Sequence, residues 1–306
     1  MPLTPQAERW HAARVAGQVR PLYEQSLAEA RAADLADIQA SSGTPEPVFS
    51  VEDLAALDGK IPLRLYRPSD APNLPVLVYF FGGGWVLGQI ETCDALCRTL
   101  TNLVGCACIA VGYRLAPEHK FPAAVEDCAE AVRWISAAAG SLGLDPDRIA
   151  VGGDSAGGNL AAVTAQTVRD VSLTAQLLVY PNTQYHSDTE SLRSIDDPAL
   201  FNRRSVEWYW SHYLNSPADG ADPRVSPLLA ADLTGLPDAL VITAEYDPLR
   251  DEGEQYATAL AAAGVTVERK RYDGVMHGFF TMSGVLDEAG QALQQSAAFL
   301  RREFGL

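Results

Sequence analysis

The amino-acid sequence predicts an α/β fold in which a mostly parallel, eight-stranded sheet is flanked by helices and carries a helical cap. Three observations predict it. Short apolar runs rich in β-branched residues alternate with amphipathic stretches, which is the pattern of strands joined by crossover helices. A chain of 306 residues, 47% of them hydrophobic, can bury the large core that such a sheet needs. Two helix-like segments interrupt the alternation, and we expect them to form the cap.

The strands are expected where short apolar runs lie between turn residues. In chain order they are Val48–Val51, Ile61–Tyr66, Val76–Phe81, Cys106–Tyr113, Arg148–Gly152, Ala175–Tyr180, Ala239–Ala244 and Thr266–Tyr272. Helices are expected where apolar residues recur with a helical period. They are Glu91–Leu103, Ala123–Ala139, Gly157–Val168, Glu252–Ala263 and Glu288–Phe304.

Two segments fall outside this alternation. Thr4–Ala36 holds two alanine-rich helical stretches before any strand, and a second segment covers residues 184–221. The second includes an aromatic helix, Arg204–Leu214, whose apolar side chains share one face. Residues 1–45 and 184–221 are therefore predicted to form the cap, and residues 46–183 and 222–306 to form the α/β domain. The alternative is that both segments only cover core surface.

The composition disfavours several classes of function. A net charge of -16 argues against binding to nucleic acid, because a phosphate-binding face needs an excess of basic side chains. No run of about 18 apolar residues occurs, so no membrane span is expected. The stretch through Val19 lacks the unbroken apolar segment of a secretory signal. The chain has five cysteines, an odd number that cannot all pair in disulfides within one chain. Together these features predict a cytoplasmic protein whose cysteines are buried, reduced thiols.

The strongest functional signal is Gly153-Asp154-Ser155-Ala156-Gly157, which lies between an expected strand and an expected helix. It fits the G-x-S-x-G pattern, in which glycines let the chain turn sharply and expose a serine hydroxyl at a helix N-terminus. Ser155 is therefore the predicted nucleophile. A phosphate-binding turn is the alternative, but this turn has no lysine and no Walker spacing.

A serine hydroxyl needs a base to remove its proton. In serine hydrolases of α/β architecture the chain order is serine, acid, histidine, which removes His11 and His119. His186 and His212 lie in the predicted cap. His277 follows the last strand in a loop with glycines on both sides, which can turn the imidazole toward the sheet edge. His277 is therefore the predicted base.

The acid that orients the imidazole should follow the penultimate strand. Ala239–Ala244 leads to two candidates, Glu245 and Asp247. Asp247 is preferred because Pro248 suits the first turn of a helix and leaves Asp247 at its entrance. A plain helix N-cap is the alternative role for Asp247. Asp251 is expected to be structural.

Acyl transfer also needs donors for the negative charge that develops on the carbonyl oxygen. The strand Val76–Phe81 ends in a glycine triplet whose backbone can approach a substrate closely. The predicted oxyanion hole consists of the amides of Gly83, Gly84 and Ala156.

The substrate pocket is expected between the sheet edge and the cap, because the aromatic helix lies opposite the site where an ester must sit. Its predicted lining residues are Trp85, Tyr209 and Trp210. The cap is thus expected to control chain length and not the chemistry.

Several of these ordered motifs resemble those of the bacterial hormone-sensitive lipase family of carboxylesterases. The resemblance begins at about residue 45 and includes the glycine triplet, the serine elbow, Tyr113–Glu118, Asp247–Glu252 and His277–Phe279. It implies an α/β-hydrolase fold with an eight-stranded sheet and a helical cap, no cofactor or metal, and hydrolysis of esters with short to medium acyl chains. It also implies cis peptide bonds before Pro117 and Pro122.

One position departs from the family pattern. The glycine triplet normally follows a histidine that braces the loop by hydrogen bonding, and this sequence has Phe81 there. Because the oxyanion donors are backbone amides, Phe81 puts the bracing in question and not the donors.

Three classes of function remain open. The first is a carboxylesterase in which Ser155 attacks a small-molecule ester, His277 transfers the proton and Asp247 holds the imidazole. The second is an amidase, peptidase or acyltransferase, since the fold and these three residues do not fix the acyl acceptor. The third is a ligand-binding member of the fold, which would lack one of the three. A homodimer is compatible with the sequence.

Overall fold

The computed structural model describes residues 2–306 and contains one eight-stranded sheet of order β1-β2-β4-β3-β5-β6-β7-β8. Its strands are β1 (Ser50–Ala56), β2 (Ile61–Arg67), β3 (Leu74–Phe80), β4 (Ala107–Val111), β5 (Leu144–Asp154), β6 (Leu173–Val179), β7 (Asp238–Tyr246) and β8 (Val267–Met276). The β1–β2 and β2–β4 pairs are antiparallel, and the remaining neighbours are parallel. The predicted mostly parallel sheet of eight strands is confirmed.

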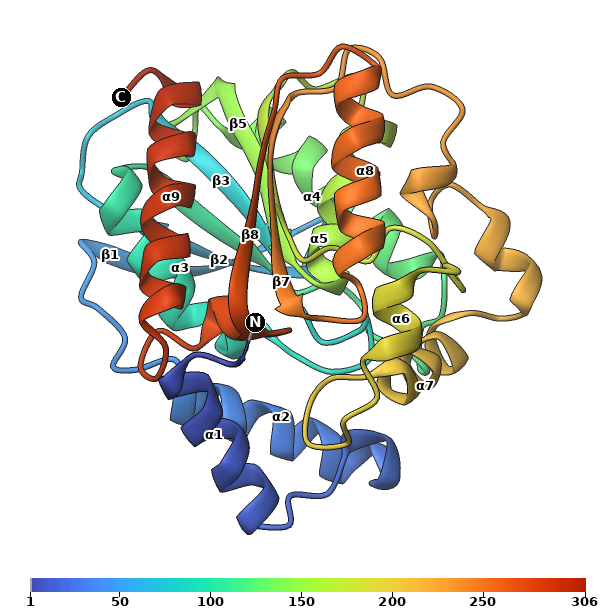
Figure 1. Ribbon diagram of the computed structural model, residues 1–306. Helices are drawn as coiled ribbons and strands as arrows, with labels where there is room; N and C mark the ends of the chain where they lie inside the picture. Colours follow the sequence, from blue (N-terminus) through green and yellow to red (C-terminus); the bar gives the residue numbers. More distant parts are fainter. Residues whose placement is uncertain (1) are drawn as a thin grey trace.

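Helices cover both faces of the sheet (Figure 1). One face carries α3 (Ile90–Val104) and α9 (Asp287–Phe304), and the other carries α4 (Ala123–Ala138), α5 (Ala156–Thr167) and α8 (Arg250–Ala262). The central strands β3 and β4 are buried along their whole length, as expected for strands that are covered on both sides. The core therefore lies in two layers, one on each face of the sheet.

The helices of the two segments outside the alternation lie together at one end of the sheet, toward which β7 points (Figure 1). They are α1 (Pro5–Ala16), α2 (Leu27–Ser41), α6 (Glu190–Ser194) and α7 (Arg203–Tyr213). The two segments contact each other: His11 Nε2 lies 2.8 Å from Asp197 Oδ2, and the Arg204 guanidinium lies over the Tyr23 ring. Short 3-10 helices occupy Leu22–Glu24, Pro217–Ala221, Pro227–Leu229 and Phe279–Thr281.

The loop between β4 and α4 joins this helical layer to the sheet. It contains two cis peptide bonds, Ala116–Pro117 and Phe121–Pro122, as the family resemblance implies. Arg31 of α2 forms an ion pair with Glu118 at 2.7 Å and donates to the carbonyl of Val86 at 3.0 Å. A single α2 side chain therefore holds both this loop and the loop that follows β3.

The first strand differs from its prediction. The expected strand was Val48–Val51, whereas β1 runs from Ser50 to Ala56 and forms a hairpin with β2. An edge strand exposes one face, so the acidic residues Glu52 and Asp53 are tolerated there and the apolar run does not mark its extent. The strand ends where Leu57 and Asp58 adopt positive φ angles in the turn.

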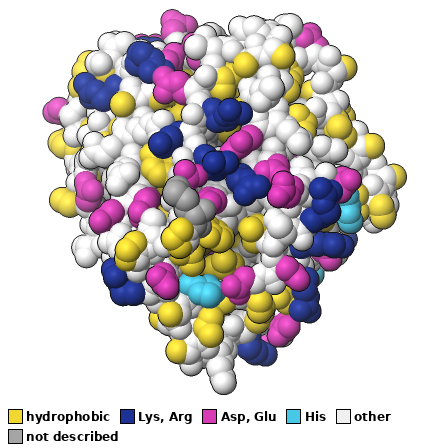
Figure 2. All heavy atoms as spheres, in the orientation of Figure 1, with side chains coloured by type: hydrophobic (Ala, Val, Ile, Leu, Met, Phe, Trp, Pro, Cys, Tyr) yellow, Lys and Arg dark blue, Asp and Glu magenta, His cyan; other side chains and the backbone are white. Residues whose placement is uncertain are grey.

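The surface carries charges of both signs. Figure 2 shows basic and acidic side chains interspersed on one face, with apolar side chains gathered near α1. The acidic surplus of the sequence is thus not concentrated in one patch of this face. No helix within residues 2–306 is long and apolar enough to cross a membrane.

Candidate active site

Ser155 lies at the turn between β5 and α5, with φ of 56° and ψ of -119°. A β carbon at Gly153 would lie 2.4 Å from the backbone of Gly157, and a β carbon at Gly157 would lie 1.9 Å from the carbonyl oxygen of Phe80. Both positions therefore require glycine. This close packing holds Ser155 in a conformation that residues with a side chain rarely adopt.

His277 connects Ser155 to Asp247. Its Nε2 lies 2.9 Å from Ser155 Oγ, and its Nδ1 lies 2.7 Å from Asp247 Oδ2. The Asp247 side chain is fully buried, and its Oδ1 accepts a hydrogen bond of 2.8 Å from the Leu249 amide. When Nδ1 donates its proton to the carboxylate, Nε2 is left as an acceptor that faces the serine hydroxyl. The three residues predicted in separate loops thus form one chain of hydrogen bonds.

The competing candidates have other partners. Glu245 accepts a hydrogen bond of 2.7 Å from the amide of Gly274, and so holds the loop that precedes His277. His212 Nδ1 lies 2.9 Å from the carbonyl of Trp208 within α7. Glu245 and His212 therefore lie outside the hydrogen-bond chain that joins Asp247, His277 and Ser155.

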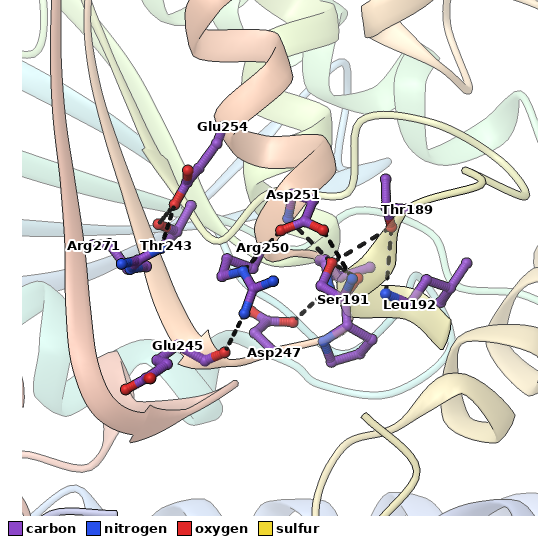
Figure 3. Close-up of polar contacts among 12 residues, drawn as sticks. Thr189, Ser191, Leu192, Thr243, Glu245, Asp247, Arg250, Asp251, Glu254 and Arg271 are labelled. Carbon is purple, nitrogen blue, oxygen red and sulfur yellow. Dashed lines mark hydrogen bonds and ion pairs between the residues drawn. The ribbon is translucent and has the colours of Figure 1, made fainter. Parts of the chain in front are cut away.

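Asp251 joins α6 to the turn that carries Asp247 (Figure 3). Its Oδ2 accepts a hydrogen bond of 2.8 Å from the Ser191 amide, and Ser191 Oγ donates to the carbonyl of Pro248 at 2.9 Å. Arg250 Nε donates to Asp251 Oδ1 at 2.8 Å. The contacts of Asp251 are thus with neighbouring structure and not with the imidazole.

The glycine loop after β3 is braced from two sides. Asp154 Oδ1 accepts hydrogen bonds from the Tyr79 hydroxyl at 2.7 Å and from the Gly82 amide at 3.1 Å. The Phe81 ring stacks on Tyr113 with 4.4 Å between centroids, and the Tyr113 hydroxyl donates to the Phe81 carbonyl at 2.7 Å. Phe81 therefore fixes the start of the loop by packing, where the family pattern has a hydrogen-bonding histidine.

The predicted oxyanion donors are available. Within residues 2–306, the amides of Gly83, Gly84 and Ala156 donate no hydrogen bond to a protein acceptor. A β carbon at Gly83 would lie 2.4 Å from the Leu87 carbonyl oxygen, and one at Gly84 would lie 2.0 Å from the Tyr209 ring. Both loop positions therefore need glycine, and three unpaired amides lie around the serine elbow.

A cavity of about 480 Å³ connects Ser155 with the helical layer. Its wall is mostly apolar and includes Trp10, Leu22, Ile38, Phe201, Tyr209 and Met282. Gly83, Gly84 and His277 also line it, so the reacting groups and the apolar wall share one space.

The structure places the three predicted pocket residues differently. Tyr209 lines the cavity, whereas Trp85 and Trp210 are not among the described residues of its wall. Trp85 is 1% exposed, and its ring lies 4.3 Å from Tyr213 and 4.5 Å from Trp210. This aromatic stack lies between α7 and the loop after β3. It therefore supports the wall of the cavity without lining it.

Two aromatic residues that contact the imidazole were missed by the sequence reasoning. The Phe201 ring stacks on His277 with 4.1 Å between centroids, and the Tyr180 ring lies 4.5 Å from the same imidazole. Phe201 lies in an irregular segment where no periodicity marks it. Tyr180 could have been identified from the sequence, because it is predicted at the carboxyl end of a central strand, where ligands bind in α/β sheets.

No group of His, Cys, Asp and Glu side chains within residues 2–306 is arranged to hold a metal ion. All five cysteines are buried free thiols. Burial raises the pKa of Cys106 to about 12. The thiols therefore pack as small apolar groups and are not nucleophiles.

The wall of the cavity also contains a carboxylate in an unusual environment. Asp34 of α2 lines the cavity, and its Oδ2 is buried without a hydrogen-bond partner within residues 2–306. Burial, with further contributions from Asp37 and Asp154, raises the pKa of Asp34 to about 7. A group of this kind makes the stability of the fold depend on pH.

We expect Asp34→Asn to stabilise the protein above neutral pH. The pKa of Asp34 is higher in the folded state, at about 7, than in the unfolded state, at about 3.9. Between these values the folded state binds more protons, so stability falls as pH rises. The gain from asparagine should be near zero below about pH 4 and at most about 4 kcal/mol above about pH 8. Thermal unfolding at both pH values measures it.

The matched control is Asp37→Asn on the same helix. Asp37 is paired with Arg14 at 2.9 Å and adds to the raised pKa of Asp34 only after burial, so any stabilisation from its removal that grows with pH should be much smaller than that of Asp34→Asn. A gain for Asp34→Asn that is the same at both pH values would contradict the prediction.

The chain is similar to known proteins in sequence and in structure. A family model described as alpha/beta hydrolase fold matches residues 77–281. The carboxylic ester hydrolase LipN of Mycobacterium tuberculosis is 46% identical over 233 residues, which are 73% of this chain but only 62% of LipN. The ethyl acetate hydrolase of Pseudomonas putida is 38% identical over 292 residues, which are 92% of both chains.

A solved structure shows the same architecture. The ester-hydrolase EH1AB1 from the metagenome of Lake Arreo superposes with a TM-score of 0.94 at 39% identity, covering 99% of this chain and 100% of that one. The chain therefore belongs to the alpha/beta hydrolase fold family, among its hormone-sensitive lipase-like carboxylesterases.

Proposed function

We propose that the protein is a carboxylesterase that hydrolyses esters with short to medium acyl chains through Ser155, His277 and Asp247. The observation that carries this proposal is the continuous hydrogen-bond chain from Asp247 through His277 to Ser155, which opens into a mostly apolar cavity. The ester hydrolases among the relatives support it. No other function has a comparable observation in its favour.

Acylation begins when Ser155 Oγ attacks the ester carbonyl carbon while Nε2 of His277 accepts the hydroxyl proton. Asp247 holds the Nδ1 proton and stabilises the imidazolium that forms. The carbonyl oxygen becomes an oxyanion, which the amides around the serine elbow receive as hydrogen-bond donors. The imidazolium then protonates the leaving alkoxide, the alcohol departs, and the acyl group remains on Ser155.

Deacylation repeats these steps with water as the nucleophile. His277 accepts a proton from water as its oxygen attacks the acyl carbon, and a second oxyanion forms at the same amides. When this intermediate collapses, His277 returns the proton to Ser155 Oγ and the carboxylic acid is released. Tyr180 and Phe201 pack against the imidazole and keep it oriented through both half-reactions.

We also propose that residues 1–45 and 184–221 act together as the cap over a catalytic domain of residues 46–183 and 222–306. Side chains from both cap segments, Trp10 and Tyr209 among them, line the cavity above Ser155. A cavity of about 480 Å³ supports a preference for small substrates. The wall of the cap should therefore set the length of acyl chain that fits.

A fluorophosphonate label combined with an ester panel tests the proposed function. The label should modify Ser155, as shown by peptide mass spectrometry, and kcat/KM for p-nitrophenyl esters should be highest for short to medium acyl chains. The related ester-hydrolase EH1AB1 was solved in complex with a derivative of bipyridine phosphonate, which supports the choice of probe. A labelled protein that cleaves amides but no esters would favour an amidase, and an unlabelled protein would favour ligand binding.

Phe81→His should change activity little. Phe81 already fixes the glycine loop by stacking on Tyr113, so a histidine adds no oxyanion donor. We expect kcat/KM for p-nitrophenyl acetate to change by less than about tenfold, equivalent to about 1.4 kcal/mol. Loss of one oxyanion donor would instead cost about 10²–10³ in kcat. An inactive wild type that Phe81→His activates a hundredfold would contradict this prediction. It would show that the glycine loop of the wild type does not hold the oxyanion donors in place.

A reducing, cytoplasmic environment is a further proposal, supported by the five free and buried thiols. Self-association into a homodimer stays a prediction, which light scattering after size-exclusion chromatography tests directly.

A further inference from the structure

Most of the charged side chains that line the cavity have partners within residues 2–306. Arg14 donates to Asp37 Oδ2 at 2.9 Å, and Asp154 accepts the two hydrogen bonds that brace the glycine loop. His277 is engaged on both ring nitrogens. Asp34 differs, because no described side chain or amide donates a hydrogen bond to its carboxylate and its Oδ2 is buried.

Asp34 shares one cavity with Ser155 and Gly84, and the ring of Tyr209 packs directly over Gly84. Burial and, after it, the Asp34 carboxylate raise the pKa of Tyr209 well above its ordinary value. The charge of the Asp34 carboxylate therefore affects Tyr209, in the part of the cavity where Tyr209 packs over the glycine loop.

A bound ligand changes the free energy of such a carboxylate. An apolar substrate would remove water from it and leave it without a donor, which is unfavourable. A substrate with an O–H or N–H group could supply the missing donor, and a hydrogen bond to a charged acceptor is among the stronger ones. A substrate carboxylate would be repelled.

We propose that Asp34 is a specificity-determining residue that favours esters carrying a hydrogen-bond donor, a hydroxyl or an ammonium group, in the part that occupies the cap side of the cavity. This inference rests on the proposed esterase function. It adds a polar selection to the length selection that the apolar wall provides.

Matched esters test the proposal, with hydrolysis followed by pH-stat titration above about pH 8, where Asp34 is ionised. The acyl-side arm compares ethyl butanoate with ethyl 3-hydroxybutanoate, ethyl 3-aminobutanoate and monoethyl succinate. The alcohol-side arm compares butyl acetate with 4-hydroxybutyl acetate and 4-aminobutyl acetate. The quantity measured is the kcat/KM ratio of each substituted ester to its parent, so the fraction of active protein cancels.

In the wild type, we expect at least one donor-bearing ester to exceed its parent by about tenfold or more, and monoethyl succinate to fall below ethyl butanoate. Asp34→Leu should remove most of this preference, and Asp34→Asn should reduce it. The control Asp37→Asn should keep the preference for donor-bearing esters, because Asp34 remains and Asp37 already has Arg14 as its partner. The arm and the substituent with the largest ratio identify the side of the ester and the donor.

Ratios in Asp34→Leu or Asp34→Asn that equal those of the wild type would overturn the proposal. If Asp34→Leu fails to fold, the nearly isosteric Asp34→Asn still reports the ratio. A wild type without preference for any donor-bearing ester would also overturn it. Failure of the wild type to hydrolyse either parent ester would contradict the proposed function itself, which separates the two conclusions.

Discussion

Replacing Ser155 by alanine is expected to lower kcat by about 10⁶, the largest effect that we predict for a single substitution. The hydroxyl is the atom that bonds to the acyl carbon, and His277 has no other proton to accept at that position. The small residual rate should come from the unpaired amides and from substrate binding, which remain. Steady-state hydrolysis of p-nitrophenyl acetate measures the loss.

The fold of Ser155→Ala should be intact. Alanine removes one oxygen, and the turn is fixed by the packing of Gly153 and Gly157 rather than by the hydroxyl. Thermal unfolding should therefore give a melting temperature close to that of the wild type. Ser141→Ala, at an exposed position between α4 and β5, is the matched control and should keep full activity. Full activity in Ser155→Ala would contradict the assignment of Ser155 as the nucleophile.

The parts of the fold that sequence reasoning predicted well are those specified by local patterns. Buried strands such as β3 and β4 are continuous apolar runs because helices cover both of their faces. The serine elbow could be predicted because its pattern is local: a β carbon at Gly153 would lie 2.4 Å from the backbone of Gly157 in the same motif. The order of acid and histidine then followed from the strands that precede them.

The two segments outside the strand–helix alternation could be located from the sequence, but their contribution to the cavity could not. An amphipathic helix reveals that one face is buried and not which neighbour buries it. Tyr209 and Trp210 are adjacent on α7, yet Tyr209 faces the cavity and Trp210 packs on Trp85. Phe201 and Asp34 come from segments far apart in the chain and line one cavity, a long-range arrangement that no local pattern encodes.

The second large effect concerns Asp247→Asn, which we expect to lower kcat by about 10⁴. Asp247 is an acceptor on both oxygens: Oδ1 from the Leu249 amide at 2.8 Å and Oδ2 from His277 Nδ1 at 2.7 Å. Asparagine has one acceptor and one donor group. Because its oxygen is needed by the Leu249 amide, its NH₂ group would face Nδ1 and make that nitrogen the acceptor.

The imidazole of Asp247→Asn would then carry its proton on Nε2, the nitrogen that lies 2.9 Å from Ser155 Oγ. A protonated Nε2 cannot accept the serine proton, so both acylation and fluorophosphonate labelling should slow together while the melting temperature changes little. Asp251→Asn is the matched control four residues further along, because its contacts are with Ser191 and Arg250. It should retain activity within about tenfold. If Asp251→Asn were the inactive variant and Asp247→Asn the active one, the imidazole would be oriented by a different acid from the one in this hydrogen-bond chain.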